Sequence, residues 1–344
     1  MTETVYEAPA GLAERPRRVL KSVTVLALLL VLTIVFSIIN MGIGAIRFSP
    51  WDIAASLAGI GDPDLAAIIM EYRIPRIVLA ILTGAGLAIS GVITQSVMRN
   101  PLAAPDTLGI SGGAGLAAVI VTLLLPASAP GAVSTAAFLG GAMVAVVVYL
   151  LAHRGGVEPI RLALVGVAAS AFCAAAIQLL VSKANPNVNS ALIWLSGSLW
   201  GRTWDQVNEL LPWIALLIPL SWALAIQLDL MNLGDNVAAG LGIRVQFMRF
   251  LLLAFSVGMT GAAVAAVGTI GFAGLISPHM ARNLVGSRHK ILVPTAGVLG
   301  GLLVLAADSI GRGLLPPLEI PAGLIISLIG APYFLYLLRR ESKR

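Results

Sequence analysis

The sequence predicts an all-α fold, a polytopic integral membrane protein with about ten membrane-spanning helices. Its 344 residues are 58% hydrophobic and 11% charged, whereas a typical soluble domain carries about 25% charged residues. Each apolar run in the chain approaches the roughly 20 residues with which a helix crosses a bilayer. The runs without Asp, Glu, Lys or Arg are residues 23–39, 77–98, 108–125, 162–180, 291–307 and 320–338.

The polar N-terminal tail, residues 1–19, leads into the first predicted span at 20–42. Four basic residues between positions 15 and 21 lie just before the apolar run. The run is longer than the apolar part of a cleaved signal peptide. Because Lys and Arg collect on the cytoplasmic side of membrane proteins, we expect an uncleaved first helix with a cytoplasmic N-terminus.

The later basic residues orient the rest of the chain in the cell (cytoplasmic or inner) membrane. With the N-terminus inside, the loops assigned to the cytoplasm contain Arg99, Arg154, Arg161, Arg244, Arg249, Arg282, Arg288, Lys290 and the basic C-terminal tail. This distribution follows the rule that short cytoplasmic loops are rich in Lys and Arg. Both termini are then cytoplasmic, so the number of spans is even.

The stretch 250–281 has basic flanks on both sides, so it must cross the membrane twice or not at all. About 32 residues is short for two full crossings. We therefore predict a hairpin with one abbreviated helix and a reversal near Gly271. The ten predicted helices are residues 20–42, 72–98, 107–125, 133–152, 160–181, 207–228, 247–267, 272–286, 291–308 and 319–338.

The sequence lacks the usual motifs of an enzyme or an ion-coupled pump. It contains no Gly-Lys dipeptide and so no phosphate-binding loop, and its single Cys173 gives no cysteine metal cluster. Ion-coupled transporters carry Asp, Glu or His within their spans, but the middles of these spans offer little beyond Gln95 and Gln178. We predict a transporter subunit without its own cofactor, metal or catalytic residues, which takes its energy from another polypeptide. A secondary transporter that acts without an ATPase is the alternative.

A series of motifs, in order along residues 20–340, resembles the FecCD family, the type II ABC importer permeases for iron-siderophores, haem and vitamin B12. The motifs are 73–76 (RIPR), 87–91 (LAISG), 99–105 (RNPLAAP), 194–199 (WLSGSL), 233–242 (LGDNVAAGLG), 270–279 (IGFAGLISPH), 320–323 (IPAG) and 330–334 (GAPYF). The segment 287–290 (SRHK) departs from the acidic-His-Arg pattern of the family, which leaves the substrate open.

The resemblance implies several partners. A second permease copy or a paralogue would complete a dimer around a central pathway, and two ABC ATPase subunits would bind ATP in the cytoplasm. An extracytoplasmic substrate-binding protein would deliver an iron-siderophore, haem or corrinoid complex. The basic residues are dispersed and predict no nucleic-acid surface. Membrane lipid is a further expected partner.

Residues 229–246 form the longest predicted cytoplasmic loop, within a single transmembrane permease domain at 20–340. Val237, Ala238 and Leu241 have helical spacing, which predicts a small amphipathic helix near the membrane surface. By resemblance, this coupling segment fits a groove on the ATPase, and a plain surface helix is the alternative. The coupling residues are Leu233, Gly234, Asp235, Ala238, Ala239, Leu241 and Gly242.

The turn after the second predicted span is a candidate cytoplasmic gate. Pro101 donates no backbone hydrogen bond and restricts Asn100 to extended geometry, so the helix is expected to end here. By resemblance, Leu102 would meet its dimer mate as an apolar constriction, and Asn100 would hydrogen-bond across the axis. A tight turn without a gating role is the alternative.

Arg73, Arg76 and Arg312 fall on the predicted outer side, against the positive-inside trend. By resemblance, they dock carboxylates of the binding protein, for which guanidinium groups give strong charge-assisted bonds. Asp308 lies four residues before Arg312, the spacing of an ion pair on one helix. Anchoring to lipid headgroups is the alternative.

Overall fold

The structure, a computed structural model, describes residues 14–44, 48–183 and 186–341 and confirms an all-α fold. Its elements are α1 (Glu14–Gly42), α2 (Pro50–Leu57), α3 (Pro63–Ile68), the π-helical turn η1 (Ile69–Arg73), α4 (Ile74–Met98), the 3-10 turn η2 (Pro105–Leu108), α5 (Ile110–Leu124), α6 (Ala132–Ala152), α7 (Pro159–Val181), α8 (Val188–Leu195), α9 (Trp204–Ala223), α10 (Ala225–Met231), α11 (Asp235–Gly240), α12 (Val245–Val267), α13 (Ala273–Val285), α14 (His289–Leu314) and α15 (Ala322–Glu341). Among the described residues, seven helices are long and apolar enough to span a membrane, or eight if α9 and α10 count as one bent span.

Each of the ten predicted spans corresponds to a helix, but three of them differ from a simple crossing. The helices α5 and α13 have only 15 and 13 residues, so both fall short of the bilayer thickness. The helix α9 bends by 57° into α10 at Leu224. The break between α12 and α13, at residues 268–272, contains Gly271, where the sequence predicts the reversal.

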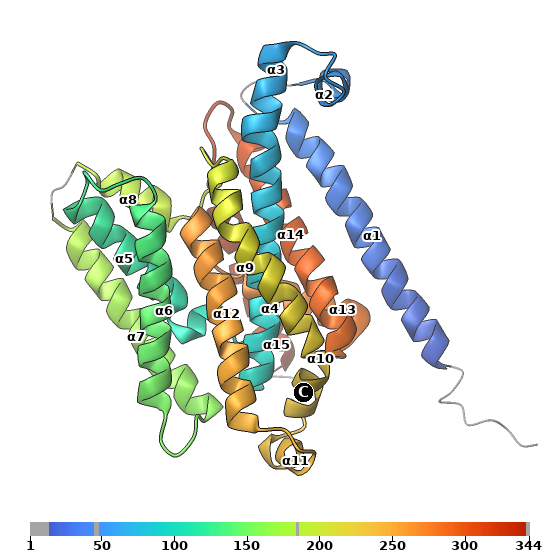
Figure 1. The fold of residues 1–344 in the computed structure, drawn as a ribbon, viewed down its shortest axis with the longest axis vertical. Helices are drawn as coiled ribbons and strands as arrows, with labels where there is room; N and C mark the ends of the chain where they lie inside the picture. The colour runs from blue at the N-terminus through green and yellow to red at the C-terminus, as the bar shows by residue number, and fades with distance from the viewer. Residues whose placement is uncertain (1–13, 45–47, 184–185, 342–344) are drawn as a thin grey trace, which may run out of the picture.

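Figure 1 shows a bundle in which α4 stands at the centre, α1 lies along one edge and α5 to α8 form the opposite side. The short helices α2 and α3 cap one end, and α11 caps the other. We call these the α2 end and the α11 end. The helix α1 begins, and α15 ends, toward the α11 end (Figure 1), as an even number of spans requires.

The helix α4 packs against α9, α12, α13 and α14. Its closest approaches use glycine, because a side chain at Gly84 would collide with the backbone of Gly300 on α14. In the same way, a side chain at Gly91 would collide with the backbone of Gly274 on α13. Small residues let membrane helices approach at backbone distance, where van der Waals packing replaces the hydrophobic effect.

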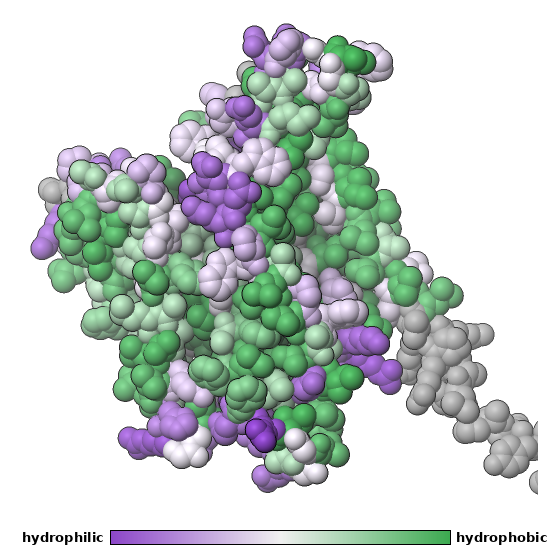
Figure 2. Space-filling view, in the orientation of Figure 1, coloured by the Kyte–Doolittle hydropathy of each residue, from purple (hydrophilic) through white to green (hydrophobic). Residues whose placement is uncertain are grey.

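A buried hydroxyl cluster adds polar contacts between α4 and α12. Ser90 Oγ lies 2.6 Å from both Ser256 Oγ and Thr260 Oγ1, and Thr94 Oγ1 lies 3.0 Å from Ser256 Oγ. The outside of the bundle is apolar, and Figure 2 shows hydrophobic residues over its middle and hydrophilic residues gathered toward its two ends. A lipid-facing belt of this kind is what a polytopic membrane protein requires.

Candidate functional sites

Exposed apolar side chains lie on and beside the helix α11 at one end of the molecule. Val237 on the helix and Leu241 directly after it are 49% and 58% exposed, and Leu233, two residues before the helix, is 58% exposed. We call these three side chains the apolar stripe. Ala238, which the predicted face included, is fully buried. Backbone turns with positive φ bound the helix at Gly234 (φ +108°) and Gly242 (φ +88°), a conformation that suits glycine.

Asp235, the first residue of α11, is held by two arginines from other helices. Its carboxylate pairs with Arg99 at the end of α4 and with Arg249 on α12, where Arg249 Nη2 lies 2.9 Å from Oδ1. The Arg249 side chain is 1% exposed and also donates to the carbonyl of Val157. Gln246 accepts from the Val157 amide at 3.0 Å. The start of α11 is therefore fixed to α4, α12 and the loop between α6 and α7.

The candidate gate, residues 100–102, comes directly after Arg99 in the chain. Arg99 ends α4 in a left-handed conformation (φ +48°), which turns the chain sharply into Asn100 and Pro101. The Asn100 side-chain oxygen accepts from the Leu102 amide at 2.9 Å, so it closes its own turn. Asn100 is exposed and Leu102 is half-buried. The predicted turn is present, and a gating role for it stays a prediction.

A buried histidine joins three further segments near the same turn. His289, at the start of α14, is 1% exposed, and its Nδ1 lies 2.6 Å from Asp229 Oδ1 on α10. Its Nε2 lies 2.7 Å from Ser96 Oγ on α4. One residue before Ser96, Gln95 accepts from Arg282 of α13 at 3.1 Å. The last turn of α4 therefore contacts α13, α14 and, through His289, α10.

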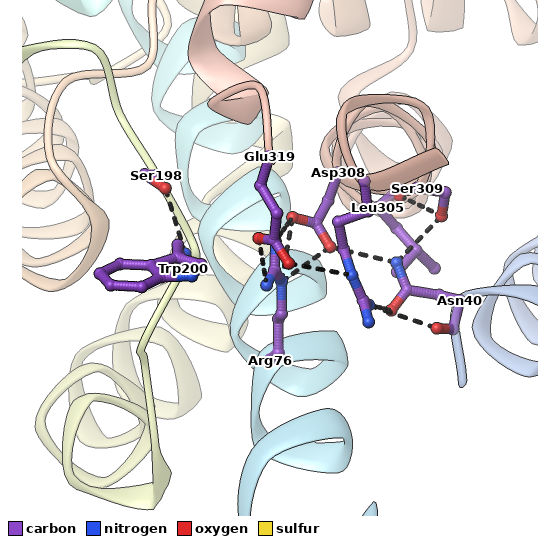
Figure 3. A network of polar contacts seen from close by, with 9 residues as sticks. Asn40, Arg76, Ser198, Trp200, Leu305, Asp308, Ser309 and Glu319 are labelled. Carbon is purple, nitrogen blue, oxygen red and sulfur yellow. Dashed lines mark hydrogen bonds and ion pairs between the residues drawn. The ribbon is translucent and has the colours of Figure 1, made fainter. Parts of the chain in front are cut away.

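At the α2 end, Arg76 forms the centre of a second polar network (Figure 3). Its Nη2 lies 2.7 Å from Asp308 Oδ1, and its Nη1 lies 2.8 Å from Glu319 Oε2. Asn40 of α1 donates to Asp308 at 3.1 Å and accepts from Arg312 at 2.9 Å. The network thus binds α1, α4, α14 and the loop before α15 together.

The three predicted docking arginines lie close together, but they point inward. Side-chain exposure is 11% for Arg76 and 5% for Arg312, and Arg73 is buried, with its guanidinium 3.9 Å above the Phe48 ring. Asp308 pairs with Arg76 of α4 and not with Arg312, the partner that its sequence spacing predicted. Docking by these arginines stays a prediction.

The surroundings also shift the pKa values of two side chains outside the spans. Burial raises the pKa of Asp106 in η2, and a hydrogen bond from the Ser111 hydroxyl opposes that shift. Burial lowers the pKa of Arg202, which Glu209 opposes. Both Arg202 and Glu209 line a polar cavity of about 670 Å³ beside α8 and α9. Within the described part of the chain, no three His, Cys, Asp or Glu residues cluster as a metal site would require.

Sequence reasoning did not find the contacts of Asp235 with Arg99 and Arg249, or the role of His289. The pairs Arg99–Asp235 and Ser96–His289 are 136 and 193 positions apart, so no local spacing reveals them. A weak signal was present, because Asp229 and His289 each border an apolar segment, where an isolated charged or titratable side chain needs a partner.

Comparison with known proteins gives matches over most of the chain. The family model described as the FecCD transport family matches residues 29–340. The Fe(3+)-citrate import system permease protein YfmE of Bacillus subtilis (strain 168) is 47% identical over 330 residues, which are 96% of this chain and 98% of that protein. The Fe(3+) dicitrate transport system permease protein FecD of Escherichia coli (strain K12) is 44% identical over 273 residues, 79% of this chain and 85% of that one.

A solved structure gives an independent match to the fold. It is an inward-facing conformation of a metal-chelate type ABC transporter, with a TM-score of 0.83 and 30% sequence identity. The match covers 92% of this chain and 99% of that one. The order and packing of the helices in this chain are therefore similar to those of a transporter permease.

Proposed function

Because this chain belongs to the FecCD transport family, we propose that it forms the membrane pathway for an Fe(3+) chelate of a small carboxylate ligand. At the coarser level, it is a permease subunit of a siderophore or metal-chelate ABC importer. The observation that supports the narrower cargo is its identity of 47% and 44% to two permeases named for ferric citrate. This narrows the cargo classes expected from the sequence, which included haem and corrinoids.

The proposed energy source is a pair of ABC ATPase subunits bound at the α11 end, which would face the cytoplasm. The supporting observation is the exposed apolar stripe of Leu233, Val237 and Leu241, which lies on and beside a helix fixed at its first residue. An apolar stripe at the polar end of the molecule, outside the lipid-facing belt, suits a protein partner. A second permease, identical or related, would complete the pathway.

We further propose that an extracytoplasmic binding protein docks at the α2 end through Arg73, Arg76 and Arg312. Two of these arginines share the carboxylate of Glu319, which lies 2.8 Å from Arg76 and 3.8 Å from Arg312. Glu319, at 21% exposure, is more exposed than Asp308, at 3%. A carboxylate of the partner would therefore compete with Glu319 for Arg76, and docking would weaken as salt rises.

The test is uptake into proteoliposomes that contain the permease with its second permease chain, its ATPase and its binding protein. Radioactive iron supplied as ferric citrate is expected to enter when ATP is enclosed with the ATPase. Iron supplied as a hydroxamate siderophore, haem iron and cobalamin serve as the competing cargoes. Preferential uptake of one of these would reject the citrate-type cargo. Uptake that persists without the ATPase would favour the secondary transporter.

A further inference from the structure

The last turn of α4 is where the contacts of the coupling segment converge. Arg99 of that turn binds Asp235 at the start of α11. Ser96, three residues earlier, binds His289, which in turn binds Asp229 near the C-terminal end of α10. Both the beginning of segment 229–246 and the start of its helix α11 are thus connected to the same turn of α4. Immediately after this turn come Asn100 and Leu102.

The carboxylate of Asp235 is the more direct of these two connections. It binds Arg249, whose side chain is 1% exposed and is held a second time by the Val157 carbonyl. It also binds Arg99, whose side chain is 35% exposed. One partner is therefore fixed in the packed interior, and the other belongs to the turn that leads into the candidate gate. Because Arg249 belongs to α12, its pair with Asp235 links movement of α11 to α12.

We propose that Asp235 is the joint through which movement of α11 reaches the gate turn, because one carboxylate holds Arg99 of α4 and Arg249 of α12 together. This inference rests on the proposed function, since it requires an ATPase that moves α11. Force would enter at the exposed stripe of Leu233, Val237 and Leu241, and it would leave through Arg99 to residues 100–102.

Glycine turns bound α11 on both sides, and the ion pairs of Asp235 lie beside the first of them. Gly234 and Gly242 flank the helix in conformations that suit glycine, and no other residue would touch a side chain added at either position. Between these glycines Ala238 is fully buried, so the six-residue helix packs against its neighbours through one small side chain. The ion pairs of Asp235 add a charged connection at its first residue. Through them, movement of α11 would be passed to α4 and α12.

The lead variant is Arg99→Gln, tested in the reconstituted importer with both permease chains, the ATPase and the binding protein. Arg99 is partly exposed and Arg249 keeps its pair with Asp235, so the fold is expected to remain intact. Arg99→Lys keeps the charge and shares the same left-handed backbone position. The matched control is Arg154→Gln, because Arg154 is an exposed arginine in the loop between α6 and α7.

Three quantities are measured for each variant: copurification of the ATPase, the rate of ATP hydrolysis and the iron taken up per ATP. Arg99→Gln is expected to keep the first two and to lose about fivefold or more in iron per ATP, the lower range of couplings between distant sites. Arg99→Lys is expected to recover most of the loss. A merely structural role of Arg99 would lower ATPase copurification or protein yield and leave iron per ATP unchanged.

Two results would overturn the joint. Iron per ATP in Arg99→Gln equal to that in Arg154→Gln would mean that the pair transmits nothing. An equal loss in Arg99→Gln and Arg99→Lys would mean that the charge is not what transmits movement. Failure of the proposed function looks different, because the unmodified importer would then bind no ATPase or take up iron without ATP.

Discussion

Glu319 is the more exposed of the two carboxylates in the α2-end network, at 21%. It pairs with Arg76 at 2.8 Å and lies 3.8 Å from Arg312. If a binding protein supplies a carboxylate to Arg76, Glu319→Gln removes the internal competitor. We expect docking at low salt to tighten by about twofold to fivefold, the range of a partly exposed ion pair. Binding of the purified binding protein to the permease in nanodiscs measures this.

The control for this variant is Glu71→Gln, because Glu71 is an exposed carboxylate near the same end. Weaker docking in Glu319→Gln would instead make Glu319 part of the docking surface. Reversing Arg76 to Glu is a poorer experiment, because it would place a third carboxylate beside Asp308 and Glu319 in a buried position. Such a variant is expected to disturb the fold, so a loss of docking in it would not be specific to the docking surface.

Asp106 gives a prediction for the pH dependence of stability. Burial raises its pKa in the folded protein, so the folded state holds the proton to a higher pH than the unfolded chain does. The stabilising contribution of protonated Asp106 is therefore complete at low pH, and it is lost as the pH rises through the raised pKa. Asp106→Asn mimics the protonated form and is expected to remove this loss. Melting temperatures of both proteins from about pH 4 to about pH 8 test it, and parallel curves would contradict it.

At the scale of elements, the glycine contacts of α14 give a test with an internal control. A methyl group at Gly300 would lie 2.5 Å from the Ala88 side chain and would collide with the Gly84 backbone. Overpacking of this kind costs about 1–3 kcal/mol, so Gly300→Ala is expected to destabilise the protein. Gly313→Ala on the same helix meets only Ile43, at 3.8 Å, and is expected to be tolerated. Thermal unfolding in nanodiscs compares the two, and equal melting temperatures would refute the close packing.

The stripe on α11 gives the prediction for ATPase binding. Leu241→Asp places an unpaired charge in the proposed apolar contact, where it is costly, so copurification of the ATPase is expected to fall. Asn236→Asp adds the same charge to an exposed position of the same helix, outside the stripe, and is expected to have little effect. Equal copurification in both variants would show that the stripe does not contact the ATPase.

The elements were largely predictable from the sequence, and their breaks were not. Apolar runs reveal spans because a chain in lipid must satisfy its backbone hydrogen bonds within a helix. The bend at Leu224 left no such signal, since α9 tolerates Pro212 and Pro219 without breaking. The sequence predicted that the arginines of the α2 end lie on one side of the membrane, but it did not predict that their side chains point inward. Arg76 finds Asp308 at a distance of 232 positions along the chain, and a single sequence does not encode such pairings in its spacing.

At the scale of the whole molecule, the orientation in the membrane is the decisive prediction. In a Cys173→Ala background, a single cysteine at Asn236 lies at the α11 end, and one at Trp51, which is 76% exposed, lies at the α2 end. A maleimide that does not cross membranes is expected to label position 51 in intact cells and position 236 only after the membrane is opened. The reverse pattern would invert the proposed topology and exclude ATPase binding at α11.

The rod formed by α3, η1 and α4 runs unbroken from Pro63 to Met98, 36 residues or about 54 Å at the rise of a helix. That is longer than the roughly 30 Å apolar layer of a bilayer, and Figure 1 shows the rod standing above its neighbours at the α2 end. Its tightest contacts, at Gly84 and Gly91, lie nearer to Met98 than to Pro63. A stiff lever with such a fulcrum has unequal arms, so a given tilt moves the Pro63 end about twice as far as the Met98 end, and in the opposite direction. A force applied at the Pro63 end would therefore be increased at the Met98 end, and a movement that starts at the Met98 end would be enlarged at the Pro63 end.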